Sequence, residues 1–270
     1  MVQELDYIRW FTAANPGPMT LNGTNQYVLG RDATTVIDVA LPSSGNIDGI
    51  LEQVEAMGAK KVETILITHI HRDHCGGALA LKKRCGAKLG ISRTRAGYLG
   101  GEDFQYGEGD RISYDGGELT VVHTPGHESG HCCFYETRQE VLFTGDHILG
   151  RGTAVIGPPD GDMAHYIQSL EKLLDLKIQI LLPGHGPHMD DPYGKIREYI
   201  EHRLMREQQI LRCLKDGRHT IDSMVEVIYQ DLTPVLVPVA GRSVEAHLIK
   251  LVREKRIVQQ GDEYFVLSSP

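Results

Sequence analysis

The strongest constraint on the fold is a short run of metal-binding side chains, Thr68-His69-Ile70-His71-Arg72-Asp73-His74. Neutral imidazoles and a carboxylate at this density suit a borderline-soft divalent metal. The strand-like segment 64–68 precedes the run, and side chains alternate along a strand, so His69 and His71 can face one side. Asp73 and His74, on the turn that follows, can face a second metal. The chain must therefore present a sharp turn at the end of a strand.

Three more candidate ligands each follow an apolar, strand-like segment. His127 comes after 119–122, Asp146 after 141–144 and His185 after 178–182. Loops at strand ends are where α/β scaffolds present ligands, and neighbouring glycines let the backbone turn sharply. The predicted metal ligands are His69, His71, Asp73, His74, His127, Asp146 and His185.

The remaining pattern alternates strand-like and helix-like segments, which predicts an α/β fold. The expected strands, rich in β-branched residues, are 27–29, 35–39, 64–68, 119–122, 132–135, 141–144 and 178–182. The expected helices, with apolar residues at helical spacing, are 47–57, 78–84 and 163–176.

The C-terminal part has a different organisation. A long helical pattern covers 194–214, and Gly217 is a stop signal for it. Helical patterns at 221–232 and 243–253 follow, and then a hairpin signal with its turn at Gly261-Asp262. This order is typical of a winged helix, and we predict a catalytic domain over 1–204 and a winged-helix-like domain over 205–270.

Composition excludes several classes of protein. The chain is 41% hydrophobic and carries a formal charge of −8, which fits a globular protein and disfavours broad wrapping of nucleic acid. No stretch approaches the roughly 20 apolar residues that span a bilayer, and the N-terminus lacks a targeting pattern. Five cysteines without Cys-x-x-Cys spacing indicate reduced thiols. We expect a cytoplasmic protein that does not bind membranes.

These motifs resemble the metallo-β-lactamase superfamily, whose His-x-His-x-Asp-His signature is matched at 69–74. A closer resemblance, to the lactamase-beta-like subgroup, rests on 15–18, 23–27, 145–150 and the C-terminal part. The resemblance implies a four-layer αββα sandwich that binds two divalent metal ions, with zinc favoured. It assigns His69, His71 and His127 to the first metal, Asp73, His74 and His185 to the second, and makes Asp146 the bridge.

The resemblance also implies hydrolysis by a hydroxide that bridges the two metals, with Asp73 orienting this nucleophile and relaying its proton. One member of the subgroup is a single-strand-selective endoribonuclease, whereas other relatives hydrolyse acyl thioesters. Single-stranded RNA is favoured by six basic and no acidic residues over 82–95, although a solvated helix end and loop explains that run equally well. A small-molecule ester or thioester is favoured by the likeness of 124–131 to glyoxalase II (hydroxyacylglutathione hydrolase).

A third hypothesis makes the C-terminal domain a nucleic-acid-binding module. Its third helical segment, 242–256, has five basic and two acidic residues, a small excess for groove binding. We therefore disfavour duplex DNA and prefer a lid over the metal site. The sequence does not indicate an oligomeric state.

The other histidines and one aspartate receive supporting roles. We expect Asp38, at a strand end, to accept a hydrogen bond from a ligand. Structural roles near the ligands are expected for His123, His131, His147 and His188. Solvent exposure is expected for His165, His202, His219 and His247.

Overall fold

The computed structural model describes residues 5, 7–42 and 45–267, and its internal contacts divide the chain into two units. Unit 1 comprises 1–124, 130–153 and 176–193, and unit 2 comprises 125–129, 154–175 and 194–270. The predicted boundary at residue 205 falls inside a continuous helix, α5 (Pro192–Lys215), and the division into 1–204 and 205–270 stays a prediction.

Unit 1 contains a six-stranded sheet in the order β1-β2-β3-β4-β5-β6. The strands are β1 (Ile8–Thr12), β2 (Asn25–Gly30), β3 (Ala33–Ile37), β4 (Lys61–Leu66), β5 (Lys88–Ser92) and β6 (Phe104–Tyr106). The first three strands pair antiparallel, and β3 to β6 are parallel. The carboxyl ends of β3 and β4 therefore meet at one edge, where the sequence motif begins.

A second, five-stranded sheet has the order β11-β10-β9-β8-β7, and β10 with β11 is its parallel pair. The strands are β7 (Arg111–Tyr114), β8 (Gly117–His123), β9 (Cys132–Glu136), β10 (Val141–Gly145) and β11 (Ile180–Pro183). One apolar cluster joins the two sheets, with Tyr27, Phe134 and Phe143 among its members. Tyr27 and Phe143 meet edge to face at 5.0 Å.

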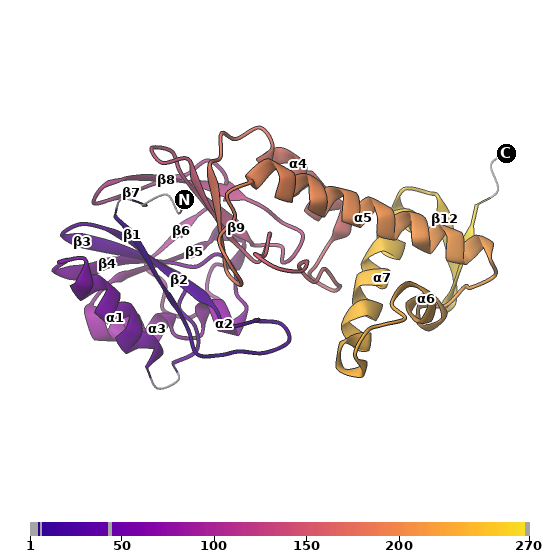
Figure 1. Ribbon diagram of the computed structural model, residues 1–270, viewed down its shortest axis with the longest axis horizontal. Coiled ribbons are helices and arrows are strands. Elements are labelled where there is room, and N and C mark those ends of the chain that lie inside the picture. Colours follow the sequence, from indigo (N-terminus) through magenta and orange to yellow (C-terminus); the bar gives the residue numbers. More distant parts are fainter. Residues whose placement is uncertain (1–4, 6, 43–44, 268–270) are drawn as a thin grey trace. The chain divides into compact units, whose positions relative to one another are not determined.

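The other face of the six-stranded sheet is covered by α1 (Asn46–Ala56) and α3 (Ala78–Cys85), as Figure 1 shows. Strand β2 shows why both faces are apolar: Tyr27 and Leu29 belong to the core between the sheets, and Val28 belongs to the core under the helices. Because successive side chains of a strand point to opposite faces, alternate residues of β2 pack into two different cores. Unit 1 has a helix layer and two sheet layers, and the expected helices 47–57 and 78–84 are confirmed.

Unit 2 contains α4 (Met163–Leu173), α5, α6 (Ile221–Ile228), α7 (Val237–Arg253) and the hairpin β12 (Ile257–Gln260) and β13 (Glu263–Val266). Residues from α5, α6, α7 and β12, including Ile210, Met224, Leu248 and Ile257, form one apolar core. The order of helices and hairpin in this part matches the prediction. Helix α7 begins at Val237 rather than near residue 243, because Pro238 lies in its first turn, where proline is tolerated.

The four expectations about exposed histidines can be checked. His165 is exposed, as predicted, whereas His202 and His219 are only partly exposed. His247 is 1% exposed, so the prediction that it lies in solvent is wrong. No helix in the described ranges is both long and apolar enough to cross a bilayer.

Candidate metal centre

The strand-to-helix turn after β4 carries four of the predicted ligands. The chain bends at Thr68 as it leaves the strand, and His71, whose own backbone is extended, is the N-terminal cap of the short helix α2 (Arg72–Cys75). The helix turns the chain back at once, so Asp73 and His74 follow His71 within the first turn. His69 and His74 are both buried, at 1% and 0% exposure.

Asp38, just after β3, holds this turn. Its buried carboxylate accepts hydrogen bonds from the Thr68 backbone N–H at 2.7 Å and the Thr68 hydroxyl at 2.8 Å. It also accepts from His74 Nδ1 at 2.7 Å. Because an ionised carboxylate only accepts, Nδ1 of His74 carries the hydrogen and Nε2 presents its lone pair. Asp38 therefore accepts a hydrogen bond from a predicted ligand, as expected.

Asp38 also orients His69, through Thr68. The Thr68 hydroxyl gives its one hydrogen to Asp38, so its oxygen accepts from His69 Nδ1, which lies 3.0 Å away. The Nε2 lone pair of His69 is thereby directed to the site. One carboxylate fixes the tautomers of two imidazoles that the sequence assigns to different metals.

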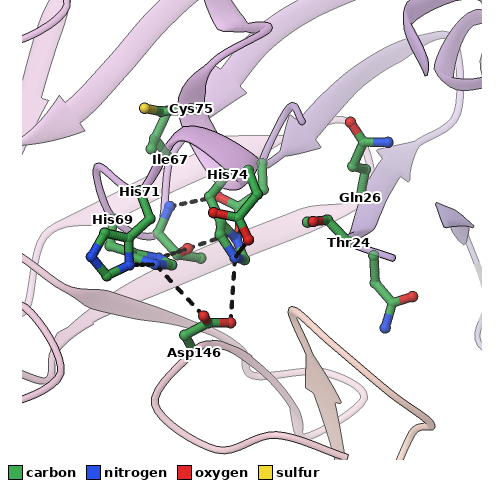
Figure 2. Close-up of polar contacts among 12 residues, drawn as sticks. Thr24, Gln26, Ile67, His69, His71, His74, Cys75 and Asp146 are labelled. Carbon is green, nitrogen blue, oxygen red and sulfur yellow. Dashed lines mark hydrogen bonds and ion pairs between the residues drawn. The ribbon is translucent and has the colours of Figure 1, made fainter. Parts of the chain in front are cut away.

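A first cluster in unit 1 consists of His69, His71 and Asp146. One possible ligand atom from each lies within 4.8 Å of the others. His69 Nε2 is 2.9 Å from His71 Nδ1 and 3.9 Å from Asp146 Oδ2. Figure 2 shows Asp146 facing the imidazole rings of His69 and His74. This geometry suits one cation held by two imidazoles and a carboxylate.

His127 lies on the 125–129 segment, which belongs to unit 2. Its Nδ1 donates to the Val155 backbone carbonyl at 2.8 Å, so Nε2 is the nitrogen that a metal would use. Its membership of the first metal site stays a prediction.

The second cluster consists of Asp73, His74 and His185, whose ligand atoms also lie within 4.8 Å of one another. His185 Nε2 is 3.2 Å from Asp73 Oδ2 and 3.2 Å from His74 Nε2. Asp146 Oδ1 is 3.3 Å from the Nε2 atoms of both histidines. Asp146 thus contacts residues of both clusters, the position that a bridging ligand requires.

Gly184 allows His74 and Asp146 to lie this close together. A Cβ atom at this position would lie 2.6 Å from His74 Cε1 and 2.9 Å from Asp146 Oδ1. A side chain would therefore displace two of the converging groups.

The donor set of the second cluster fits a cation. His185 Nδ1 donates to the Gly23 carbonyl at 3.0 Å, and His74 Nδ1 donates to Asp38. Both Nε2 atoms of the neutral rings are then acceptors, and they point at each other and at carboxylate oxygens. The two Nε2 atoms and the oxygens of Asp73 and Asp146 are thus four acceptors with no hydrogen between them. Because their lone pairs repel one another, the cluster requires a positive charge, supplied by a metal ion or by protons.

The pKa shifts of these side chains also indicate that the second cluster favours a positive charge. Burial alone would raise the pKa of Asp146, but His74 and His185 lower it well below its ordinary value. Burial alone would lower the pKa of His185, but Asp146 and Asp73 raise it to about 9. The pKa of His74 is raised well above its ordinary value for the same reason, since Asp146 and Asp38 outweigh burial. The cluster attracts positive charge at the Nε2 atoms.

Cys75, inside the motif, does not join the ligands. Its thiol donates to the Ile70 carbonyl at 3.2 Å and points away from Asp146 (Figure 2). Burial raises the pKa of this thiol to about 11, so it stays protonated and unreactive.

Three of the residues that hold the ligands were not found by sequence reasoning: Thr68, Asn25 and Tyr27. Asn25 and Tyr27 lie on β2 and bond to the loop that carries His185. A signal was present, because Asn25 and Gln26 are amides in a strand whose six residues are all buried. Buried polar groups need partners, and a short amide in a buried strand indicates that a loop is tied there.

Comparisons with known proteins agree with this geometry. Residues 19–185 match the family model "Metallo-beta-lactamase superfamily", and residues 220–264 match "Beta-lactamase associated winged helix domain". A Drosophila melanogaster protein named "Beta-lactamase-like protein 2 homolog" is 35% identical over 280 residues, covering 95% of this chain and 92% of the relative. An Aspergillus fumigatus protein named "Atrochrysone carboxyl ACP thioesterase" is 29% identical over 259 residues, covering 90% and 80%.

Solved structures show the same fold. A metallo-beta-lactamase family protein from Thermus thermophilus superposes with a TM-score of 0.82 at 21% identity, over 97% of this chain and 99% of that chain. At this identity the likeness concerns the fold alone. The match extends over both the α/β part and the winged-helix part.

Proposed function

Because the chain belongs to the metallo-β-lactamase superfamily, with an α/β catalytic part and a C-terminal winged helix, we propose that it is a dinuclear zinc hydrolase of acyl thioesters. The observation that carries the metal part is the pair of clusters that share Asp146. The products are a carboxylic acid and a thiol, formed by addition of one water across the carbon–sulfur bond.

The ligands divide between two cations. His69 and His71, with His127, would hold the first, and Asp73, His74 and His185 would hold the second, with Asp146 between them. Imidazoles and carboxylates without a thiolate ligand suit zinc better than a soft metal. When bound, the cations supply water activation near neutral pH and neutralise the charge that develops on the thioester carbonyl oxygen.

Asp73 is the proposed proton carrier. Its side chain is 26% exposed, so it is the ligand of the second cluster that substrate and water can reach most easily. Burial raises the pKa of Asp73, but the contact with His185, when that ring is protonated, and the charge of His74 more than offset this, so that the pKa of Asp73 is lowered. Asp73 is ionised at neutral pH and can accept a proton from the attacking water.

Two observations support a thioester rather than RNA. The first is the printed name of the Aspergillus relative. The second concerns the basic run at 82–95, in which three of the six cations face acids: Lys82 lies 2.6 Å from Asp103, Arg84 3.2 Å from Asp48 and Arg93 2.9 Å from Asp110. Cations paired in this way offer less to a phosphate backbone than the sequence suggested.

The cations of α7 are also engaged within unit 2. Lys250 lies 2.6 Å from Glu207, and Arg253 pairs with Asp162. Arg242 donates to the Pro158 carbonyl at 2.7 Å. Such a helix presents little net positive charge to a DNA groove, which supports the prediction against duplex binding.

The test compares two substrates with one enzyme preparation loaded with zinc. Thiol release from an acyl-N-acetylcysteamine thioester is measured beside cleavage of a single-stranded oligoribonucleotide. We expect rapid thiol release that His71→Ala reduces by about a hundredfold or more, because one ligand of the first metal is lost. His165→Ala is the matched control, since this histidine is also exposed but lies on α4, outside both clusters.

Cleavage of the oligoribonucleotide without thiol release would overturn the thioester proposal in favour of a phosphodiesterase. Equal activity of His71→Ala and His165→Ala would overturn the metal mechanism itself.

A further inference from the structure

Strand β2 and the residues just before it are tied to the loop 183–186, which carries His185. The main-chain contact is direct: the Asn25 N–H donates to the Gly184 carbonyl at 2.7 Å, and Thr24 pairs with His185 in an isolated antiparallel bridge. The ring of His185 is held as well, because its Nδ1 donates to the Gly23 carbonyl. The loop follows the parallel strand β11 and leaves the ladder there, so other partners must hold it.

The side chain of Asn25 supplies two of those partners. Its amide nitrogen donates to the Pro183 carbonyl at 3.0 Å and to the Gly186 carbonyl at 2.9 Å. Its amide oxygen accepts from the Thr12 hydroxyl at 2.8 Å. All three bonds define one orientation of the amide, because a flipped amide would aim its oxygen at two carbonyls.

Tyr27 adds a further donor from the same strand. Its hydroxyl donates to the Pro183 carbonyl at 2.7 Å, and its ring is fixed against Phe143 in the core between the sheets. Asn25 and Tyr27 are 4% and 2% exposed. Burial of this kind protects the bonds from competition by water.

The four successive carbonyls of 183–186 are therefore all bonded. Pro183, Gly184 and Gly186 are bonded by Asn25 and Tyr27, and the His185 carbonyl accepts from the Gly150 N–H at 2.9 Å. A surface loop does not need two buried side chains to fix its backbone. This fixation matters for His185. To share a cation with Asp73 and His74, its Nε2 must be placed with a precision of a few tenths of an ångström.

From this network we infer that Asn25 and Tyr27 are positioning residues for the second metal: they hold the 183–186 loop so that His185 presents Nε2, and not Nδ1, to the cation. The inference rests on the metal-binding part of the proposed function. Neither residue touches substrate or metal. Their effect is on the affinity of one cation, because ligand orientation is what they control.

The experiment measures zinc affinity of the full-length protein by competition with a chromophoric chelator, without any substrate. In Asn25→Ala, we expect one of the two zinc equivalents to bind about 10- to 100-fold more weakly, while the other keeps its affinity. In Tyr27→Phe, which retains the packing against Phe143 and loses one hydrogen bond, we expect the same equivalent to weaken about fivefold.

Asn46→Ala is the matched control. Asn46 is equally buried at 1% exposure and also ties backbone, since its amide bonds the Leu41 carbonyl at 2.7 Å and the Ala14 N–H at 3.4 Å. It has no bond to a ligand loop, so zinc affinity should stay within twofold of the unmodified protein. A merely structural role for Asn25 would make the two asparagine variants alike.

Zinc affinities within twofold of the unmodified protein in both Asn25→Ala and Tyr27→Phe would overturn the inference. So would equal weakening in Asn25→Ala and Asn46→Ala. If Asn25→Ala does not fold, Tyr27→Phe decides alone. A protein that binds two zinc ions with the expected pattern but hydrolyses no thioester would refute the proposed substrate and leave this inference intact.

Discussion

The buried histidine of α7 predicts that unit 2 loses stability in mild acid. His247 is 1% exposed, and neither ring nitrogen has a hydrogen-bond partner among the described residues. Burial is the largest cause that lowers the pKa of His247 to about 3, and the nearby charges of Arg203, Lys250, His202 and Arg206 act in the same direction. The ordinary value of 6.5 applies to the unfolded chain.

The sign follows from proton counting. Between pH 6.5 and about 3 the unfolded chain binds a proton at His247 that the folded protein does not, so the free energy of unfolding falls as the pH falls through this range. At pH 5 the unfolded histidine lies about 1.5 pH units below its pKa, which lowers the stability of the folded state by about 2 kcal/mol. The figure depends on the unfolded pKa and very little on the folded one.

The comparison is between the unmodified protein and His247→Leu, unfolded by guanidinium at about pH 7 and pH 5. Leucine is of similar size and breaks no hydrogen bond of the described residues, so the variant should lose about 2 kcal/mol less than the unmodified protein on acidification. The helical circular dichroism signal comes mostly from unit 2, which contains α4, α6, α7 and nearly all of α5, and the fluorescence of Trp10, the single tryptophan, reports on unit 1 as an internal reference. Equal acid sensitivity of the two proteins would refute the reasoning.

Three further predictions concern the metal centre. Dialysis against a chelator should abolish thioester hydrolysis, and zinc should restore it; activity that persists in protein shown by elemental analysis to be metal-free would contradict the mechanism. Asp38→Asn should weaken zinc binding about 10- to 100-fold, measured by chelator competition, because an amide has one acceptor oxygen where the carboxylate uses two, one for the Thr68 N–H and the other for the Thr68 hydroxyl and His74. Gly184→Ala should eliminate one zinc equivalent, since its Cβ would lie 2.6 Å from His74. Gly241→Ala, with no atom nearer than 3.7 Å, should keep both equivalents and raise helix stability by up to about 1 kcal/mol.

Much of the fold was predictable because its strongest elements are buried on both faces. The expected strand 141–144 corresponds to β10, in which all five residues are buried, and the expected helix 47–57 corresponds to α1. Strand β5 was not predicted, because it contains Gly90 and lies within the basic run. The glycine is required by packing: a Cβ there would lie 2.5 Å from the Phe104 ring. A glycine imposed by a neighbouring strand weakens a local strand signal.

The error at His247 has a different cause. Helical spacing places His247 on one face with Val244, Leu248 and Leu251, all of which are buried. That periodicity was present in the sequence, but the histidine was interpreted from its polarity instead of from its position on the helix. Position within a periodic apolar face is the better guide when the two disagree.

The candidate site divides into a part that local sequence encodes and a part that it does not. Donor chemistry is local: three imidazoles and a carboxylate within 69–74 indicate a metal whatever surrounds them. Donor orientation is not local, because His74 is held by Asp38, 36 residues away, and the His185 loop is held by Asn25, about 158 residues away. These partners are ordinary residues in their own neighbourhoods, and nothing marks them until the strands are placed side by side. A chain could therefore keep the whole signature and lose the site by a change at Asp38 or Asn25, so the signature predicts metal binding only together with the residues that fix its tautomers.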